Sequence, residues 1–290
     1  MRENVPLSTC TTFRIGGPAR FLINVKSKEI LVRLLSALNY VEYPYRIIGG
    51  GSNILADDKG FDGVVIKLGF REIVENGNFI YADAGCSLVS VVQKSAQLGL
   101  SGLEFACGIP GTVGGAVFGN AGAFGSSMSD VVAMVDVLVD GEIVSLDNLQ
   151  CKFKYRESVL KNKNKNLTDG SGGMVIIGAY FSLRQDQPQD IQTRIKENTQ
   201  ARLLVQPKGA NAGSVFRNPP GQSAGALIDK LGLKGTKIGG AMISEKHANF
   251  IINEGDATAK DVRKIISLVK KRVKETYGIN LKTEIGIMNG

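Results

Sequence analysis

The pattern of apolar and polar positions predicts strands and helices in an irregular order. Short apolar runs at 45–48 and 64–68 are typical of buried strands. Apolar residues recur at helical spacing in 88–98, 190–204 and 258–277. Because helices do not separate successive strands regularly, the pattern predicts an α+β fold rather than a parallel α/β sheet.

Two turn signals predict β-hairpins. Asn76-Gly77 separates predicted strands at 73–75 and 79–82, and Asp140-Gly141 separates strands at 131–139 and 142–146. A final strand at 281–287 would place four side chains on one face: Leu281, Thr283, Ile285 and Ile287. The polar stretch from Lys161 to Gly173 predicts an exposed loop.

The stretch from Cys107 to Gly125 holds seven glycines and no charged residue. Valine, isoleucine and phenylalanine between the glycines distinguish it from a flexible linker. Glycine lets a backbone approach a ligand closely, and successive amides form a nest that suits a pyrophosphate. Residues 49–53 (Gly-Gly-Gly-Ser-Asn) follow a predicted strand and form a second candidate phosphate loop. Tight turns in an ordinary core remain the alternative for both stretches.

Composition and charge favour an anionic partner. Glycine makes up 36 of the 290 residues, and the net charge is +8. A basic protein attracts nucleotides, phosphates or nucleic acid. The lysine-rich runs at 161–165 and 270–274 are interpreted as solvated surface, because most such runs are.

The four cysteines lie far apart and form no CxxC pair, which favours reduced thiols and predicts no metal site. No signal peptide and no apolar run long enough to span a membrane are found, so we expect a cytoplasmic protein. Walker A, Rossmann and nucleophile-elbow motifs are absent. The single histidine, His247, leaves room for one hydrolytic triad at most.

Eight short motifs in a fixed order carry a family resemblance. In this order and spacing the chain resembles the UDP-N-acetylenolpyruvoylglucosamine reductases, from about Val5 to Ile287. The motifs are 12–18 (TFRIGGP), 49–53, 108–125, Tyr155-Arg156, 213–219 (GSVFRNP), 239–241, 244–248 (SEKHA) and Glu284.

The resemblance implies a fold with three parts. Two α+β subdomains of the vanillyl-alcohol-oxidase type (PCMH-type) would bind FAD, at 1–69 and 70–187. A C-terminal α+β domain at 188–290 would bind substrate, and the helix at 190–204 is compatible with either side of that boundary.

The resemblance also implies which residues bind FAD. The pyrophosphate would rest on backbone amides of the two glycine-rich loops, which agrees with what the glycines suggest on their own. The cofactor-binding residues would be Gly49, Gly50, Gly51, Ser52, Asn53, Gly111, Thr112, Gly114, Gly115 and Asn120.

By resemblance, NADPH reduces the flavin and the flavin then reduces the enolpyruvyl double bond. Arg156 would hold the carboxylate where negative charge develops, Ser214 would donate the proton, and Glu284 would orient the substrate. Without the resemblance, they would be a surface arginine, a turn residue after Gly213 and a solvent-facing carboxylate.

Tyr155, Asn218 and His247 match positions that contact substrate in relatives, and His247 would otherwise be a structural histidine. Arg14 and Arg202 are further candidates for anionic groups. The chain resembles the shorter class of the family, which lacks an inserted segment with a tyrosine over the uridine diphosphate. Phe124 and Cys10 stand where relatives often carry tyrosine and histidine.

These features predict a monomeric flavin reductase that uses NADPH and a UDP-linked sugar in peptidoglycan precursor synthesis, with no metal, nucleic acid or membrane partner. Three alternatives stay open: an FAD oxidase of the same fold acting on an alcohol or sugar acid, a basic nucleotide- or RNA-binding module, and a hydrolase using Ser214 and His247. Retention of Arg156, Ser214 and Glu284 together argues against the oxidase.

Overall fold

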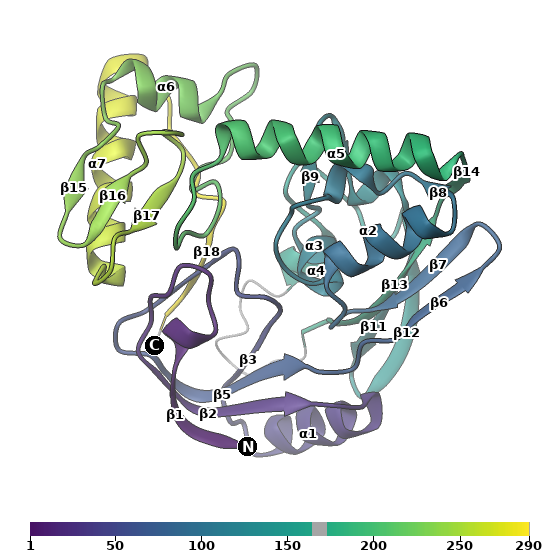
Figure 1. The fold of residues 1–290 in the computed structure, drawn as a ribbon. Helices are drawn as coiled ribbons and strands as arrows, with labels where there is room; N and C mark the ends of the chain where they lie inside the picture. Colours follow the sequence, from purple (N-terminus) through teal and green to yellow (C-terminus); the bar gives the residue numbers. More distant parts are fainter. Residues whose placement is uncertain (164–172, 290) are drawn as a thin grey trace. The chain divides into compact units, whose positions relative to one another are not determined.

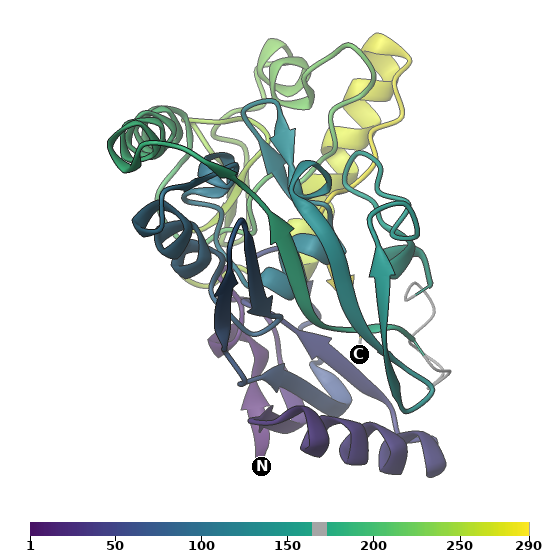
Figure 2. The ribbon, with the colours of Figure 1, turned by 90° about the vertical axis from the view of Figure 1, so that its right-hand side faces the viewer.

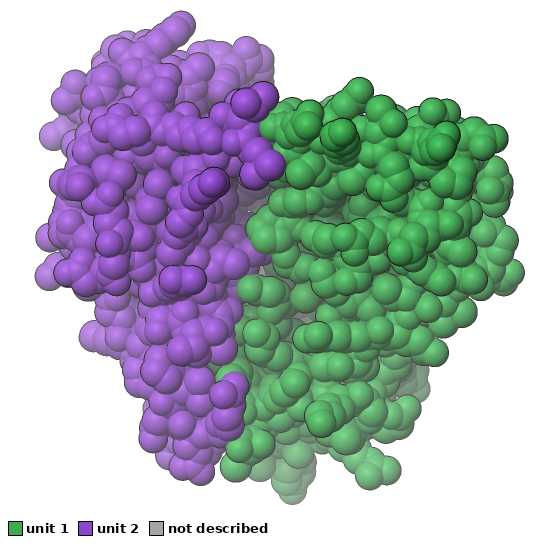
Figure 3. All heavy atoms as spheres, viewed as in Figure 1, with its two compact units in different colours: residues 1, 22–50, 63–202 green, residues 2–21, 51–62, 203–290 purple. Residues whose placement is uncertain are grey.

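The computed structural model describes residues 1–163 and 173–289 (Figure 1). The chain forms two compact units, coloured separately in Figure 3. Unit 1 comprises residues 1, 22–50 and 63–202, and unit 2 comprises residues 2–21, 51–62 and 203–290. Unit 2 thus combines most of the predicted C-terminal domain with two segments from the N-terminal part of the chain. The division into three domains stays a prediction.

Unit 1 is built on a five-stranded antiparallel sheet, visible in Figure 2. Its strand order is β12 (Glu142–Asp147), β11 (Val132–Val139), β13 (Val175–Ser182), β7 (Phe79–Asp83) and β6 (Ile73–Asn76). Helix α3 (Val113–Phe118) packs on β7 and β13, and α2 (Leu88–Gln97) packs on β8 (Leu100–Ser101) and the short helix η2 (Glu104–Ala106). The apolar residues Val113, Ala116 and Val117 of the glycine-rich stretch therefore lie in the core of this unit.

A second sheet has the order β1 (Arg2–Pro6), β2 (Pro18–Val25), β5 (Phe61–Leu68) and β3 (Tyr45–Ile48). Strand β3 is parallel to β5 and ends where the first glycine-rich loop begins. Between β2 and β3, helix α1 (Lys28–Tyr40) starts at Ser27, whose hydroxyl accepts a hydrogen bond from the Ile30 amide at 3.3 Å. Strand β1 and the first four residues of β2 belong to unit 2. Unit 1 also contains β9 (Gly122–Ala123), β10 (Ser126–Ser127), η3 (Met128–Asp130), α4 (Val159–Lys163), β14 (Arg184–Gln185) and α5 (Pro188–Val205), whose last three residues belong to unit 2.

In unit 2, one helix packs on a three-stranded antiparallel sheet and a second helix packs on the first. The strands are β15 (Lys237–Ile238), β16 (Ala241–Ile243) and β17 (Ile251–Asn253), and the helices are α6 (Ala224–Lys230) and α7 (Ala259–Tyr277). Thr258 and Asp261 form a capping box at the start of α7, and Gly278 ends it with φ 70°. Strand β4 (Ile54–Ala56) pairs in parallel with β18 (Gly286–Met288), and η1 (Leu7–Thr9) follows β1.

The structure corrects three predictions of local structure. The predicted strand at 281–287 is regular only at 286–288, and Ile287 is 43% exposed, because Leu281 and Ile285 are buried in the core of unit 2 while the last residues pair with β4. The first hairpin turns at Gly77-Asn78, one residue later than predicted, since Asn76 pairs with Phe79 and the positive φ (58°) falls on Gly77. The second hairpin, at Asp140-Gly141, is confirmed by the pairing of Val139 with Glu142.

The third correction concerns the predicted loop at 161–173, because α4 extends to Lys163. The ammonium of Lys161 donates to the carbonyl of Arg156 at 3.2 Å, so this lysine is not purely a solvated side chain. Lys165 lies outside the described residues.

The described residues also bear on the cysteines, on membrane spans and on metal binding. All four cysteines are buried and unpaired, and burial raises the pKa of Cys86 and of Cys151 to about 11. Across 1–163 and 173–289, no helix is long and apolar enough to cross a membrane. The same residues contain no group of three His, Cys, Asp or Glu side chains arranged to hold a metal ion.

Candidate functional site

The start of the first predicted phosphate loop lies against the second loop in unit 1. A Cβ added at Gly50 would lie 2.8 Å from the Cα of Gly111, and one added at Gly49 would collide with the hydroxyl of Thr112. Such backbone-to-backbone packing is open only to glycine. The sequence predicted each loop separately, and the structure brings them together.

Backbone donors remain unused where these loops meet. Among the described residues, the amides of Gly50, Gly111 and Thr112 donate no hydrogen bond. Gly111 has φ 128°, a conformation that favours glycine. Unused amides on closely packed glycine-rich loops are suited to phosphate oxygens.

Gly114 and Gly115 differ from each other in their surroundings. The amide of Gly114 donates to the carbonyl of Ala84 at 3.0 Å, and a Cβ there would lie 2.9 Å from the Cβ of Ala84. Gly114 is therefore needed for packing of α3 on the sheet. The amide of Gly115 faces the hydroxyl of Thr112 at 3.4 Å, and beyond that hydroxyl a Cβ at Gly115 would meet open space. Their contact with the cofactor stays a prediction.

Arg156 is positioned by the β9–β10 hairpin of unit 1. Its guanidinium donates to the carbonyl of Gly122 at 2.7 Å and lies 5.1 Å from the centre of the Tyr155 ring. The backbone at Arg156 has φ 58°, which is uncommon for a residue with a side chain. Such strain is found where a side chain must be aimed.

Asn120 supports the segment that carries Arg156. Its buried amide donates to the carbonyl of Lys154 at 3.0 Å, and its side-chain oxygen accepts from the amide of Ser129 at 2.9 Å. The fully buried hydroxyl of Ser158 donates to the carbonyl of Phe118 at 2.7 Å. Both bonds tie the Arg156 segment to the end of the glycine-rich stretch. Asn120 was predicted to bind cofactor, and its visible role is positional.

Ser214 and Glu284 lie on adjacent segments of unit 2. The amide of Glu284 donates to the carbonyl of Val215 at 2.8 Å, and Phe216 pairs with Thr283. The end of the first phosphate loop joins them, because Gly286 donates to the carbonyl of Asn53 at 2.9 Å. Unit 2 therefore gathers the predicted proton donor, the predicted carboxylate and Asn53.

Asn218 and His247 have clear local contacts in unit 2. The side-chain oxygen of Asn218 accepts from the amide of Ala224 at 3.0 Å, close to the start of α6. Nδ1 of His247 accepts from the amide of Asn249 at 3.1 Å, and its ring lies edge-on to Phe250 at 4.8 Å. Burial lowers the pKa of His247, which favours the neutral imidazole. Their substrate contacts stay predictions.

Asn249 holds the segment next to Ser214 in place, a role that the sequence did not reveal. Its buried side chain accepts from the amide of Phe216 at 2.9 Å and donates to the carbonyl of Phe216 at 2.8 Å. Its own carbonyl accepts from the amide of Val215 at 2.8 Å. These three bonds fix the segment that carries Ser214. Its place one residue after the 244–248 motif was the only available signal.

Two family models match separate parts of the chain. Residues 19–147 match the family model described as an FAD binding domain. Residues 205–288 match the model of the C-terminal domain of UDP-N-acetylenolpyruvoylglucosamine reductase. The predicted α+β class, with an FAD-binding part and a C-terminal domain, is confirmed.

Similar proteins cover nearly the whole chain. The UDP-N-acetylenolpyruvoylglucosamine reductase of Caldanaerobacter subterraneus is 42% identical over 98% of this chain and 92% of its own length. That of Bacillus subtilis is 42% identical over 99% of this chain and 93% of its own length.

A solved structure gives the same result. The crystal structure of the reductase from Thermus caldophilus aligns with a TM-score of 0.84 at 39% identity, covering 99% of this chain and 98% of that one. The chain therefore belongs to the family of UDP-N-acetylenolpyruvoylglucosamine reductases, and residues 19–147 are its FAD-binding domain.

Proposed function

We propose that this protein reduces the enolpyruvyl group of UDP-N-acetylglucosamine enolpyruvate to UDP-N-acetylmuramate, with bound FAD and with NADPH as reductant. The observation that carries the proposal is the backbone bond from Glu284 to Val215, at 2.8 Å. It pairs the segment that carries Glu284 with the segment that carries Ser214, in a chain that also holds an FAD-binding domain. The reaction belongs to peptidoglycan precursor synthesis.

The residues of unit 1 fit FAD. Gly49 and Gly50 pack against Thr112 and Gly111 so closely that a side chain on either glycine would collide. Among the described residues, the amides of Gly50, Gly111 and Thr112 donate no hydrogen bond. These residues would hold the pyrophosphate. When bound, FAD supplies hydride transfer between NADPH and the substrate carbon.

Arg156 stabilises the negative charge that hydride addition creates on the substrate. Adding hydride to the terminal carbon of the double bond moves an electron pair onto the neighbouring carbon and its carboxylate. A fixed guanidinium binds a carboxylate bidentately and stays charged, so Arg156 stabilises this enolate-like state. Its bond to Gly122 fixes the guanidinium before substrate arrives.

Ser214 then protonates the neighbouring carbon, which completes the addition of one hydride and one proton. A hydroxyl is a weak acid in water, but one held against a carbanion-like centre is effective. The segment around Ser214 is held rigid by the three bonds of Asn249. Glu284 orients the substrate from the adjacent segment.

The enzyme acts in the cytoplasm as a monomer. Four buried, reduced thiols and nucleotide-linked substrates support the cytoplasmic location. Light scattering is expected to give a solution mass near 31.0 kDa, and a mass about twice as large would contradict the monomer.

Substrate choice separates this function from an oxidase of the same fold. Purified protein is incubated with NADPH and the enolpyruvyl UDP-sugar, and separately with alcohols or sugar acids in air. We expect NADPH oxidation that depends on the UDP-sugar, at least about tenfold above background, and a product heavier by two hydrogen atoms. Oxidation of an alcohol or sugar acid without reduction of the UDP-sugar would contradict the proposal.

A further inference from the structure

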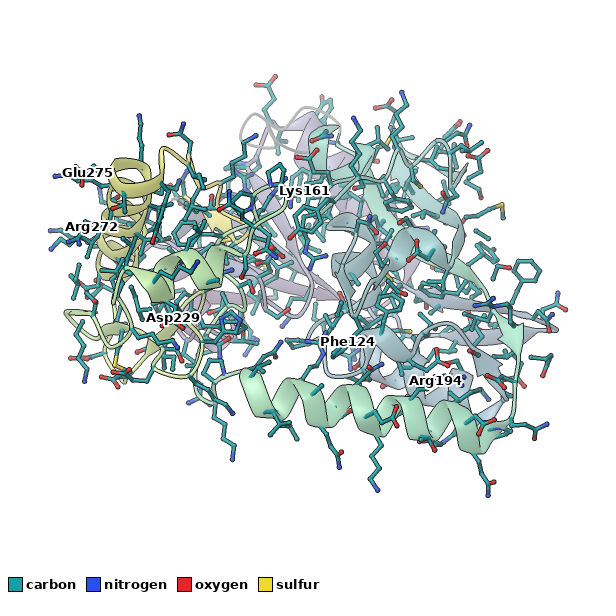
Figure 4. All side chains as sticks on the ribbon, turned by 90° about the horizontal axis from the view of Figure 1, so that it is seen from above. Phe124, Lys161, Arg194, Asp229, Arg272 and Glu275 are labelled. Carbon is teal, nitrogen blue, oxygen red and sulfur yellow. The ribbon has the colours of Figure 1, made fainter. Side chains whose placement is uncertain are left out.

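Arg202 lies near the end of α5. It is the last residue of unit 1. The central carbon of its guanidinium lies 5.4 Å from the centre of the Phe124 ring. Phe124 and Arg194, another arginine of α5, both lie along this helix in Figure 4. Stacking on an aromatic face holds the guanidinium plane in one orientation.

The charge of Arg202 has no counter-ion in the described part of the chain. Its Nε is buried and makes no hydrogen bond there, and no carboxylate lies within ion-pair distance. Arg194 contrasts with it, since it pairs with Glu104 at 2.8 Å and with Asp186 at 2.5 Å. Burial lowers the pKa of Arg202, and the nearby charge of Arg156 lowers it further. A desolvated cation beside a second cation is costly unless an anion joins them.

One hairpin holds both guanidinium groups. Arg156 donates to Gly122 on β9, and Arg202 stacks on Phe124 at the turn between β9 and β10. Phe124 has φ 51° and Gly125 has φ 80°, which gives a tight two-residue turn. The stem of Arg202 is also confined, because a Cβ at Gly108 would lie 3.1 Å from its Cδ.

We propose that Arg202 is a second anion-binding residue beside Arg156, and that it binds the phosphate oxygens of a nucleotide diphosphate. This rests on the proposed function, in which Arg156 holds the carboxylate. The substrate carries its carboxylate and its diphosphate on the same sugar ring, so two neighbouring guanidinium groups match two anionic groups. NADPH, the other ligand, also contains a diphosphate.

The test compares Arg202→Gln with Lys196→Gln. Lys196 is exposed on the same helix, so its change removes the same charge outside the site. Arg202→Gln is expected to raise the KM for the UDP-sugar about ten- to a hundredfold, as for a lost charged hydrogen bond, while kcat changes less than about threefold. Calorimetry with UDP alone should show weaker binding by a similar factor. Lys196→Gln should match the wild type in both measurements.

The two sources of diphosphate are separated by the KM for NADPH. If the KM rises for the UDP-sugar alone, Arg202 binds the diphosphate of the sugar nucleotide. If the KM rises for both the UDP-sugar and NADPH, Arg202 binds a diphosphate position that the two substrates share. If neither KM rises beyond that of Lys196→Gln, or only kcat falls, the assignment is overturned. Phe124→Leu removes the stacking surface and should raise the KM for the UDP-sugar by a smaller factor. It replaces Arg202→Gln as the test if that variant does not fold. An inactive wild-type protein would instead refute the proposed function.

Discussion

Ser214→Ala is expected to separate the two halves of the reaction. Reduction of the flavin by NADPH needs no proton from Ser214, so its rate should stay within about threefold of the wild type. Reduction of the UDP-sugar should slow by ~10²–10⁴-fold, the usual effect of removing a general acid. Stopped-flow absorbance of the flavin measures both rates on the same protein.

The control is Ser214→Cys, which keeps an acidic hydrogen at the same position. It should retain more of the second half-reaction than alanine does. Ser214 pairs with Phe250 through its backbone, and Asn249 holds the next two residues, so neither change should unfold the segment. Equal slowing of both half-reactions would show that Ser214 binds ligands rather than donating a proton.

Gly115→Val is expected to abolish FAD retention while leaving the fold intact. A Cβ at Gly115 meets only the hydroxyl of Thr112, at 3.6 Å, so the protein has room for the side chain. A cofactor bound on the neighbouring amides of Gly50, Gly111 and Thr112 would leave no room for the valine side chain. Flavin bound per protein should fall more than about tenfold, equivalent to ~1.4 kcal/mol or more of binding free energy. The flavin content and the far-ultraviolet circular dichroism of purified protein measure the two effects.

The matched control is Gly119→Ala at the other end of α3. Its φ is −90°, and an added Cβ would meet only the carbonyl of Gly115 at 3.6 Å. It should keep a full complement of flavin. Gly114→Val would be a poor test, because its side chain would collide with Ala84 and disturb the packing of α3. Stoichiometric flavin in Gly115→Val would refute the placement of the cofactor.

The sequence predicted features set by neighbouring residues better than contacts between distant segments. Glycines at 49–51 and 111 were recognised because only glycine allows the close backbone approach seen between Gly50 and Gly111. The helix at 258–277 was recognised from its apolar spacing and is α7, Ala259–Tyr277. Both features depend on residues close together in sequence.

The missed features depend on contacts between distant segments. Asn249 acts on Phe216, which is 33 residues away, and nothing local distinguishes it from a loop asparagine. Arg202 and Phe124 come together only because α5 passes the β9–β10 hairpin. The last strand was predicted too long because the pattern could not show that Ile285 packs in the core while Gly286 turns to pair with β4. Periodicity describes a segment and not its partner.

In the proposed reaction, one bound flavin passes hydride from NADPH to the enolpyruvyl UDP-sugar. The absorbance of the protein-bound flavin is therefore measured without oxygen, first with one equivalent of NADPH and then with the UDP-sugar. We expect NADPH to bleach the flavin and the UDP-sugar to restore the oxidised spectrum in full. A purified protein without flavin, or a flavin that stays reduced after the UDP-sugar is added, would contradict it.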